Sequence, residues 1–311
     1  MTGRILPRRI RGGLAALALA LPIAMGASPA AAAQRTFATP EAAVDALLAA
    51  LNGDDEGALV AIFGDDYRHL VITGDHANDV AERANAARAL AAFRVLDEAD
   101  PDRRTLIMGP HAWPVPFPLV RQGGGWRFAT EEGVEELLNR RIGANERNAI
   151  LVLQAYLDAQ RQYAARDRDG DGVLQFAQRI ASSPGKRDGL YWEAAPDDAE
   201  ASPFGPLIAR SAAYLAGRKS GEPYRGYHFR IVTRQGKGAA GGAYDYVING
   251  RLIAGFAMIA YPDAYGESGV MTFIVNHNGR IFERDLGPET EKAAAGITSF
   301  NPAKGWQEVA P

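Results

Sequence analysis

Residues 166–174 read RDRDGDGVL, and they separate a long helical pattern from a strand-rich tail. Three aspartates stand at alternate positions, and a glycine and two apolar residues follow them. This order repeats the start of the calcium-loop motif D-x-[DN]-x-[DN]-G. Carboxylates so close together repel one another unless a cation or solvent offsets them. The stretch therefore predicts either a calcium loop or a solvated acidic turn balanced by its own two arginines.

The calcium interpretation assigns a ligand to each of five motif positions. The ligands would be the side chains at positions 1, 3, 5 and 12 and the carbonyl at position 7: Asp167, Asp169, Asp171, Gln178 and Val173. Position 12 of the motif is a bidentate glutamate, so the neutral amide here leaves the cage incomplete. We expect Ca²⁺ to bind weakly, on the order of 10⁻⁴–10⁻³ M, unless a carboxylate from elsewhere completes the site.

The composition limits the classes of function. With 311 residues, 47% of them hydrophobic, the chain is long enough for two ordinary domains. The 34 basic and 37 acidic side chains give a net charge of −3, which lacks the positive field of a nucleic-acid-binding protein. There is no cysteine. Disulfides, thiolate catalysis and Cys-ligated zinc are therefore excluded.

The first 33 residues have the pattern of a secretory signal peptide. A cationic start with four arginines precedes an apolar stretch, and the small residues Ala31, Ala32 and Ala33 stand before Gln34. We expect cleavage after Ala33 and a mature protein in the periplasm or outside the cell. Arg8 and Arg9 leave the twin-arginine route open beside the general secretory route. An uncleaved N-terminal anchor is the alternative to cleavage. No later segment has the ~20 apolar residues of a transmembrane helix.

Residues 34–129 predict an N-terminal α+β domain of helices followed by an antiparallel sheet. Thr39 caps a helix with proline at its first position, a second helix ends near Phe63, and a third is expected over residues 78–98. Strands follow, the last two joined in the hairpin LVRQGGGWRF at residues 119–128. This order resembles the NTF2-like and cystatin-like folds.

Residues 130–311 predict a C-terminal α+β domain in which a long helix precedes an antiparallel sheet. The helix is expected over residues 130–166 with a break at Gly143, and the aspartate-rich loop 167–178 follows it. Asn278 and Gly279 between two apolar runs indicate a tight hairpin. A long helix, a polar loop and such a sheet are similar to the globular part of pilins and pseudopilins, which implies a pilin-like domain.

A second cluster of polar and aromatic side chains follows the aspartate loop. It could line a cleft for a small anionic or sugar ligand, or it could pin the loop to the sheet through an arginine–aspartate pair; the latter is the favoured interpretation. Its members are Lys186, Arg187, Asp188, Tyr191 and Trp192.

Catalytic motifs are weak. Ser183 and Lys186 match S-x-x-K, but the Pro-Gly between them prevents the helical turn that this pair requires. The five histidines are scattered and form no H-E-x-x-H motif. A cell-wall or polysaccharide hydrolase would need two facing carboxylates, which could come from Asp188, Glu193 or Asp245.

Several longer blocks carry a family resemblance. They read LNRRIG at 138–143, DRDGDG at 167–172, SPGKRDGLYW at 183–192, GGAYDY at 241–246 and MTFIVNH at 271–277. They resemble the signature blocks of the DUF2950 family of exported bacterial proteins, over essentially the whole mature chain. The resemblance implies no activity.

The sequence thus favours an exported, non-enzymatic binding or envelope-associated protein with an ion-stabilised loop. The envelope hydrolase stays open as the alternative.

Overall fold

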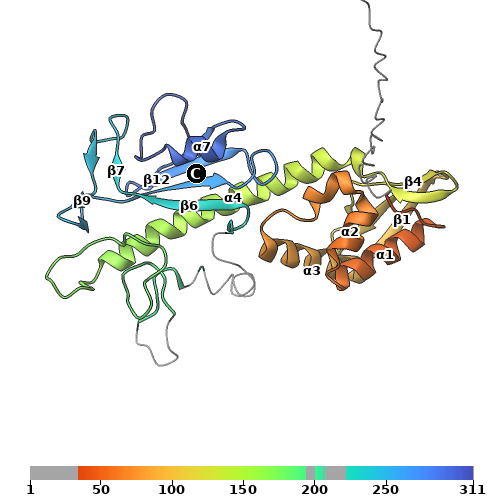
Figure 1. Cartoon of the computed structure of the whole chain (residues 1–311), viewed down its shortest axis with the longest axis horizontal. Helices are drawn as coiled ribbons and strands as arrows, with labels where there is room; N and C mark the ends of the chain where they lie inside the picture. Colours follow the sequence, from red (N-terminus) through yellow and green to blue (C-terminus); the bar gives the residue numbers. More distant parts are fainter. Residues whose placement is uncertain (1–33, 194–199, 206, 208–221, 311) are drawn as a thin grey trace, which may run out of the picture. The chain divides into compact units, whose positions relative to one another are not determined.

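The computed structural model describes residues 34–193, 200–205, 207 and 222–310 (Figure 1). The predicted signal peptide, residues 1–33, lies outside the described residues. Within the described ranges, none of the helices combines the length and the apolar character that crossing a membrane requires.

The N-terminal half begins with three helices that pack against a sheet. Thr39 caps the first helix as predicted, because its Oγ1 accepts a hydrogen bond from the Ala42 amide at 3.2 Å. Asp55 and Asp75 cap the next two helices in the same way. The helical elements are α1 (Pro40–Asn52), α2 (Glu56–Phe63), the 3₁₀ helix η1 (Asp65–Leu70) and α3 (His76–Ala92).

The first sheet is antiparallel, with the order β1-β2-β4-β5 and β3 paired to β2. The predicted end of the third helix, at residue 98, is wrong. Helix α3 ends at Ala92, and Phe93 has extended backbone angles. The Arg-Val-Leu run that follows then pairs with β2. The strands are β1 (Arg94–Asp100), β2 (Arg103–Met108), β3 (Trp113–Pro114), β4 (Leu119–Gln122) and β5 (Gly125–Phe128).

Helix α4 (Val134–Ala164) follows a 3₁₀ turn, η2 (Thr130–Glu132). The break predicted at Gly143 is wrong, because the helix runs through this residue without interruption. A glycine in a helix costs only about 1 kcal/mol relative to alanine, and packing along the rest of the helix exceeds that cost. The first turns of α4 pack on the N-terminal core, and its later turns pack on a second core.

The second sheet is also antiparallel, with the order β14-β13-β12-β11-β6. The predicted Asn-Gly hairpin is present between β12 and β13, where Gly279 has a φ of +83°. The strands are β6 (Tyr227–Val232), β11 (Ala257–Pro262), β12 (Met271–Asn276), β13 (Ile281–Asp285) and β14 (Gln307–Glu308). Helix α7 (Thr290–Ala295) follows β13, and four short strands form two small ribbons: β7 (Arg234–Gln235), β8 (Tyr244–Asp245), β9 (Val247–Ile248) and β10 (Arg251–Leu252).

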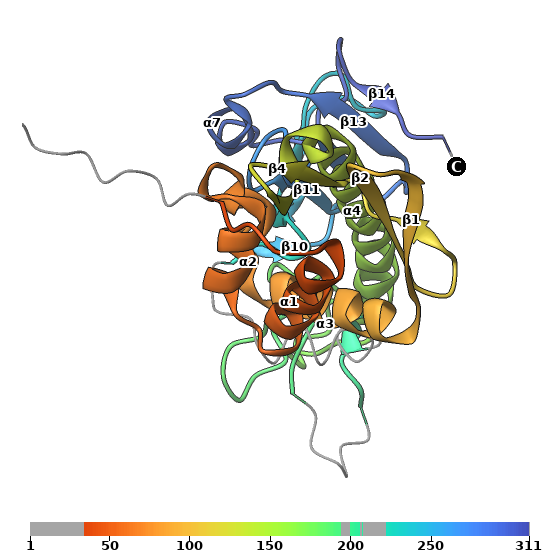
Figure 2. The same cartoon turned by 90° about the vertical axis from the view of Figure 1, so that its right-hand side faces the viewer.

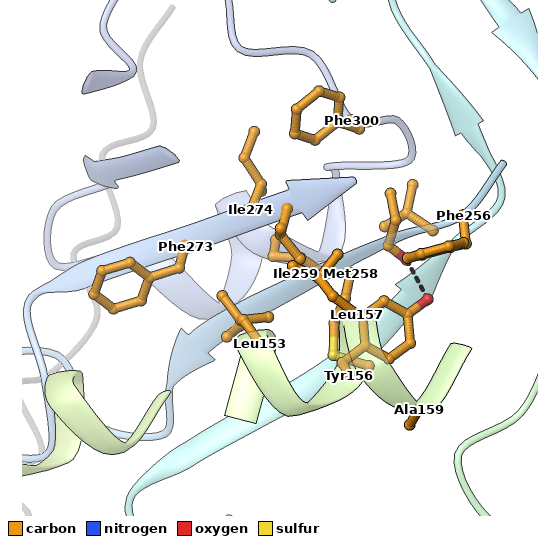
Figure 3. Close-up of a cluster of buried hydrophobic side chains, with 14 of the residues drawn as sticks. Leu153, Tyr156, Leu157, Ala159, Phe256, Met258, Ile259, Phe273, Ile274 and Phe300 are labelled. Carbon is orange, nitrogen blue, oxygen red and sulfur yellow. Dashed lines mark hydrogen bonds between the residues drawn. The ribbon is translucent and has the colours of Figure 1, made fainter. Parts of the chain in front are cut away.

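The second core lies between α4 and this sheet (Figure 3). Leu153 and Tyr156 of α4 are fully buried against Ile259 and Phe273 of the sheet. The Tyr156 hydroxyl donates a hydrogen bond to the Ala257 carbonyl at 3.2 Å, so its polar end is satisfied inside the core. Helices with antiparallel sheets confirm the predicted α+β class.

Candidate functional site

The aspartate loop is ordered by its own backbone. The Asp167 carboxylate accepts hydrogen bonds from the amides of Asp169, Gly170 and Gly172 at 3.2, 2.9 and 2.8 Å. These donors, Gly172 first, hold the pKa of Asp167 below its ordinary value. Gly172 has a φ of +82°, the sharp turn that position 6 of the calcium motif requires.

The other predicted calcium ligands bind protein groups. Asp169 accepts a hydrogen bond from the Gln175 side chain, and Asp171 forms an ion pair with Arg251. The Gln178 side-chain nitrogen donates to the Gly250 carbonyl of the β9–β10 hairpin at 2.8 Å. The loop is therefore tied both to itself and to that hairpin.

Among the described residues, no group of three or more His, Cys, Asp or Glu side chains is placed to hold a metal ion. The Val173 amide donates to Asp171 at 2.9 Å, so this aspartate faces two protein donors. A calcium ion would compete with Arg251 for the carboxylate of Asp171 and with Gln175 for that of Asp169. Calcium binding by this loop stays a prediction.

Two members of the second predicted cluster, Arg187 and Trp192, lie near Arg168, just beyond the end of α4. The Arg168 guanidinium lies 4.6 Å from the ring centroid of Tyr163 and 5.3 Å from that of Trp192. It also donates to Glu200 at 2.6 Å, and Arg187 reaches the other oxygen of this carboxylate at 3.0 Å. The pKa of Glu200 is lowered, chiefly by the hydrogen bond from Arg168. Arg187 and Trp192 thus belong to a network of ion pairs and stacked rings. We call this network the arginine cluster; its members are Tyr163, Arg168, Arg187, Trp192 and Glu200.

The remaining members of the second predicted site do not turn to that cluster. Lys186 is exposed, and Tyr191 forms a bridge with the backbone of Ala181. Asp188 accepts from the amide and hydroxyl of Ser183 at 2.7 and 2.8 Å, and these bonds lower its pKa. Arg187 pairs with Glu200 at 3.0 Å, while Asp188 closes the Ser183 turn and lies 3.8 Å from the Arg179 guanidinium.

The three carboxylates considered for hydrolysis have separate surroundings. Asp188 closes the Ser183 turn, Glu193 is exposed, and Asp245 pairs with Arg234 at 3.4 Å. None of these contacts joins one of the three to another. The hydrolase interpretation gains no support from the described residues.

A different pair of carboxylates, Glu146 and Glu283, was not singled out from the sequence. One oxygen of Glu146 accepts from the amides of Val270 and Met271 at 3.0 and 2.9 Å, which fixes the start of β12. Glu283 of β13 has a raised pKa, first through burial and then through Glu146. A signal was present in the sequence, because position 146 lies three residues before buried Ala149, on the apolar stripe of α4.

A hollow of about 420 Å³ lies between α1 and β1, within the N-terminal half. Figure 2 labels both elements. The volume of the hollow is within the range of small ligand pockets, ~300–1,000 Å³. Buried Val44 and Leu106, with partly buried Leu96, give it an apolar lining. Charged residues supply most of the remainder: Glu41, Asp45, Arg94 and Glu98.

The rim of this hollow carries an excess of negative charge. Three carboxylates face one guanidinium, which gives a net charge of −2. Arg94 pairs with Asp45 at 3.4 Å, whereas Glu41 and Glu98 have no ion pair within the part of the chain that the structure describes. Sequence reasoning missed this site, because its residues are scattered and β1 was expected to be helical.

The comparisons with known proteins give a family and nothing finer. The family model described as "Protein of unknown function (DUF2950)" matches residues 34–309. The chain belongs to this family. No curated protein and no solved structure matches it. The DUF2950 match covers both cores, and with them the hollow, the arginine cluster and the aspartate loop.

Proposed function

We propose that this DUF2950 protein is an exported, non-enzymatic binding protein whose ligand occupies the hollow between α1 and β1. The observation that carries the proposal is the hollow itself, where an apolar lining meets two carboxylates, Glu41 and Glu98, without an ion pair among the described residues. A concave apolar site with a few convergent polar groups is the usual form of a ligand pocket.

The charge of the rim selects the ligand. A net charge of −2 attracts a cation, and the apolar lining of Val44, Leu96 and Leu106 stabilises an aliphatic portion by removing it from water. The ligand is therefore a molecule or segment with both an ammonium or guanidinium group and an apolar part. This class differs from the anionic or sugar ligand expected for the cluster around Arg187.

Export belongs to the same proposal. It is supported by the cationic start, the apolar stretch and the small residues before Gln34. In the periplasm or outside the cell, millimolar calcium would also be available to the aspartate loop. Calcium would then stabilise the loop and take no part in ligand binding.

The test uses n-hexylammonium as the probe and the mature chain with labelled methyl groups. We expect the probe to shift the NMR signals of Val44, Leu96 and Leu106, whereas n-hexanoate, with the same tail and the opposite charge, leaves them in place. The double variant Glu41→Gln/Glu98→Gln should weaken binding about threefold to tenfold, since each exposed charge contact contributes ~0.2–1 kcal/mol.

The matched control is Glu135→Gln/Glu291→Gln, which removes two exposed carboxylates outside the hollow. This variant should bind the probe as the natural chain does. Equal shifts with hexylammonium and hexanoate, or equal weakening by both double variants, would contradict the proposal.

A further inference from the structure

Strand β1 is an edge strand. In the first sheet it pairs with β2 alone, and among the described residues no other strand joins it. The same strand supplies Arg94, Val95, Leu96 and Glu98 to the hollow. An edge strand presents a row of backbone donors and acceptors that another chain can pair with.

The pairing register shows which backbone groups face the open edge. Phe93 accepts a hydrogen bond from the Gly109 amide at 2.9 Å, so it is bonded toward the β2 side. In an antiparallel pair the bonded positions alternate, so Val95 is bonded toward β2, whereas Arg94 and Leu96 point their N–H and C=O groups away.

The partner strand confirms this alternation. Leu106, directly opposite Leu96, accepts a hydrogen bond from the Val115 amide at 2.8 Å, on the side of β2 that faces away from β1. Leu96 therefore has its backbone groups directed to the open edge while its side chain lines the hollow. The backbone and the side-chain features meet at the same residues.

We propose that the ligand of the hollow is an extended basic peptide segment that adds to β1 as a further strand. This inference rests on the proposed function and goes beyond it, because it names the class of ligand and the way in which it binds. The added strand exchanges hydrogen bonds with Arg94 and Leu96, and its alternate side chains enter the hollow.

The lining indicates the pattern of the peptide. Side chains two residues apart in a strand lie ~6.6–6.8 Å apart on one face. An apolar side chain opposite Leu96 meets the lining of Val44 and Leu106, and a basic side chain two residues away, on the side of Glu98, meets the carboxylates of the rim. The pattern is an apolar side chain, any residue and then a basic side chain.

A second copy of this chain is a poorer occupant. It would bring a second rim with a net charge of −2 against the first, in a protein whose own net charge is −3. Like charges brought together across an interface disfavour association. A basic peptide is complementary to the rim instead.

The experiment measures the affinity of the mature chain for the peptide TKTLTKT, acetylated, amidated and fluorescently labelled. Its lysines and leucine share one face. Two N-methylated forms of the peptide are compared. The first is methylated at the backbone nitrogens of the leucine and of a single lysine. The second is methylated at the backbone nitrogens of the two internal threonines. The first modification removes amides that face β1, and the second removes amides that face solvent.

We expect the first form to bind at least tenfold more weakly than the unmodified peptide and the second to bind within twofold of it. Hydrogen exchange should slow at the amides of Arg94 and Leu96 on binding and stay unchanged at Val95. A peptide with glutamate in place of lysine should not bind.

The outcomes separate the two proposals. Equal affinity for both N-methylated forms, with unchanged exchange at Leu96, would overturn strand addition and leave a cation-binding hollow. Failure of both TKTLTKT and n-hexylammonium to bind would overturn the proposed function as well. A concentration-dependent dimer that excludes the peptide would identify a second copy as the occupant and contradict the inference.

Discussion

The arginine cluster and the hollow show two uses of charge in one chain. In the arginine cluster, Arg168 and Arg187 both bind Glu200 and stack on Trp192. In the hollow, Glu41 and Glu98 lie beside apolar side chains with no ion pair among the described residues. The densest run of charge in the sequence is largely neutralised within the fold, whereas the scattered charges form a surface that can attract a ligand.

The largest expected effect is on stability, at the centre of the arginine cluster. Arg168→Met should lower the free energy of unfolding by about 3 kcal/mol, because it removes a buried cation and leaves Glu200 without its shortest ion pair. Urea unfolding measures the change. Arg166→Met is the matched control, since Arg166 pairs with the same carboxylate but its side chain is 66% exposed; it should cost less than about 1 kcal/mol. Equal losses in the two variants would show that the stacked arginine has no special role.

Calcium should have the next largest effect. At about ten times the dissociation constant, binding to the folded state adds about 1.4 kcal/mol, which thermal unfolding in calcium against EDTA detects. Arg251→Gln should enlarge this response, because it releases Asp171 from its ion pair. An unchanged unfolding midpoint in both proteins, up to ~10 mM calcium, would leave the loop as an acidic turn held by its own backbone.

The pH dependence should have opposite signs at two glutamates. Folding lowers the pKa of Glu200 from 4.5. As the pH falls below 4.5, the unfolded chain is therefore protonated at this group before the folded chain is. The contribution of Glu200 to the free energy of unfolding is lost over that range. Folding raises the pKa of Glu283 from 4.5. The contribution of its protonated form to the free energy of unfolding is therefore present below pH 4.5 and is lost as the pH rises through the raised pKa.

Unfolding free energies measured from about pH 3 to about pH 7 separate the two effects. Glu200→Gln should reduce the loss of stability on the acid side. Glu283→Gln should reduce the loss on the neutral side and stabilise the protein at pH 7. If Glu283→Gln destabilised the protein at pH 7, its carboxylate would not be the strained group that burial beside Glu146 implies.

The smallest expected effect on stability is in the hollow. Glu41→Gln/Glu98→Gln should change the free energy of unfolding by less than about 0.5 kcal/mol, because neither carboxylate has an ion pair to lose among the described residues. The same urea experiment measures it. A loss comparable with that of Arg168→Met would mean that the hollow is a structural feature of the fold and would remove the contrast with the arginine cluster.

Local signals in the sequence predicted much of the fold. Thr39 before a proline predicted the start of α1, and Asn278-Gly279 predicted the hairpin of β12 and β13. The errors arose where contacts distant in sequence decide the structure. The end of α3 depends on the pairing of β1 with β2, and continuity through Gly143 depends on packing along the whole of α4.

The sites follow the same division. The backbone bonds of Asp167 are local, so the ordered acidic turn could be foreseen. The grouping of Arg168 and Arg187 around Glu200 joins positions up to 32 residues apart, and the hollow joins α1 to a strand some fifty residues later. No spacing rule in a single sequence connects such residues.

The most direct test of the central claim is to locate a bound cation. Intermolecular NOEs between n-hexylammonium and labelled methyl and aromatic groups of residues 34–311 report which side chains surround the probe. We predict NOEs from its methylene groups to Val44, Leu96 and Leu106. NOEs confined to the rings of Tyr163 and Trp192 would place the site in the arginine cluster and contradict the account.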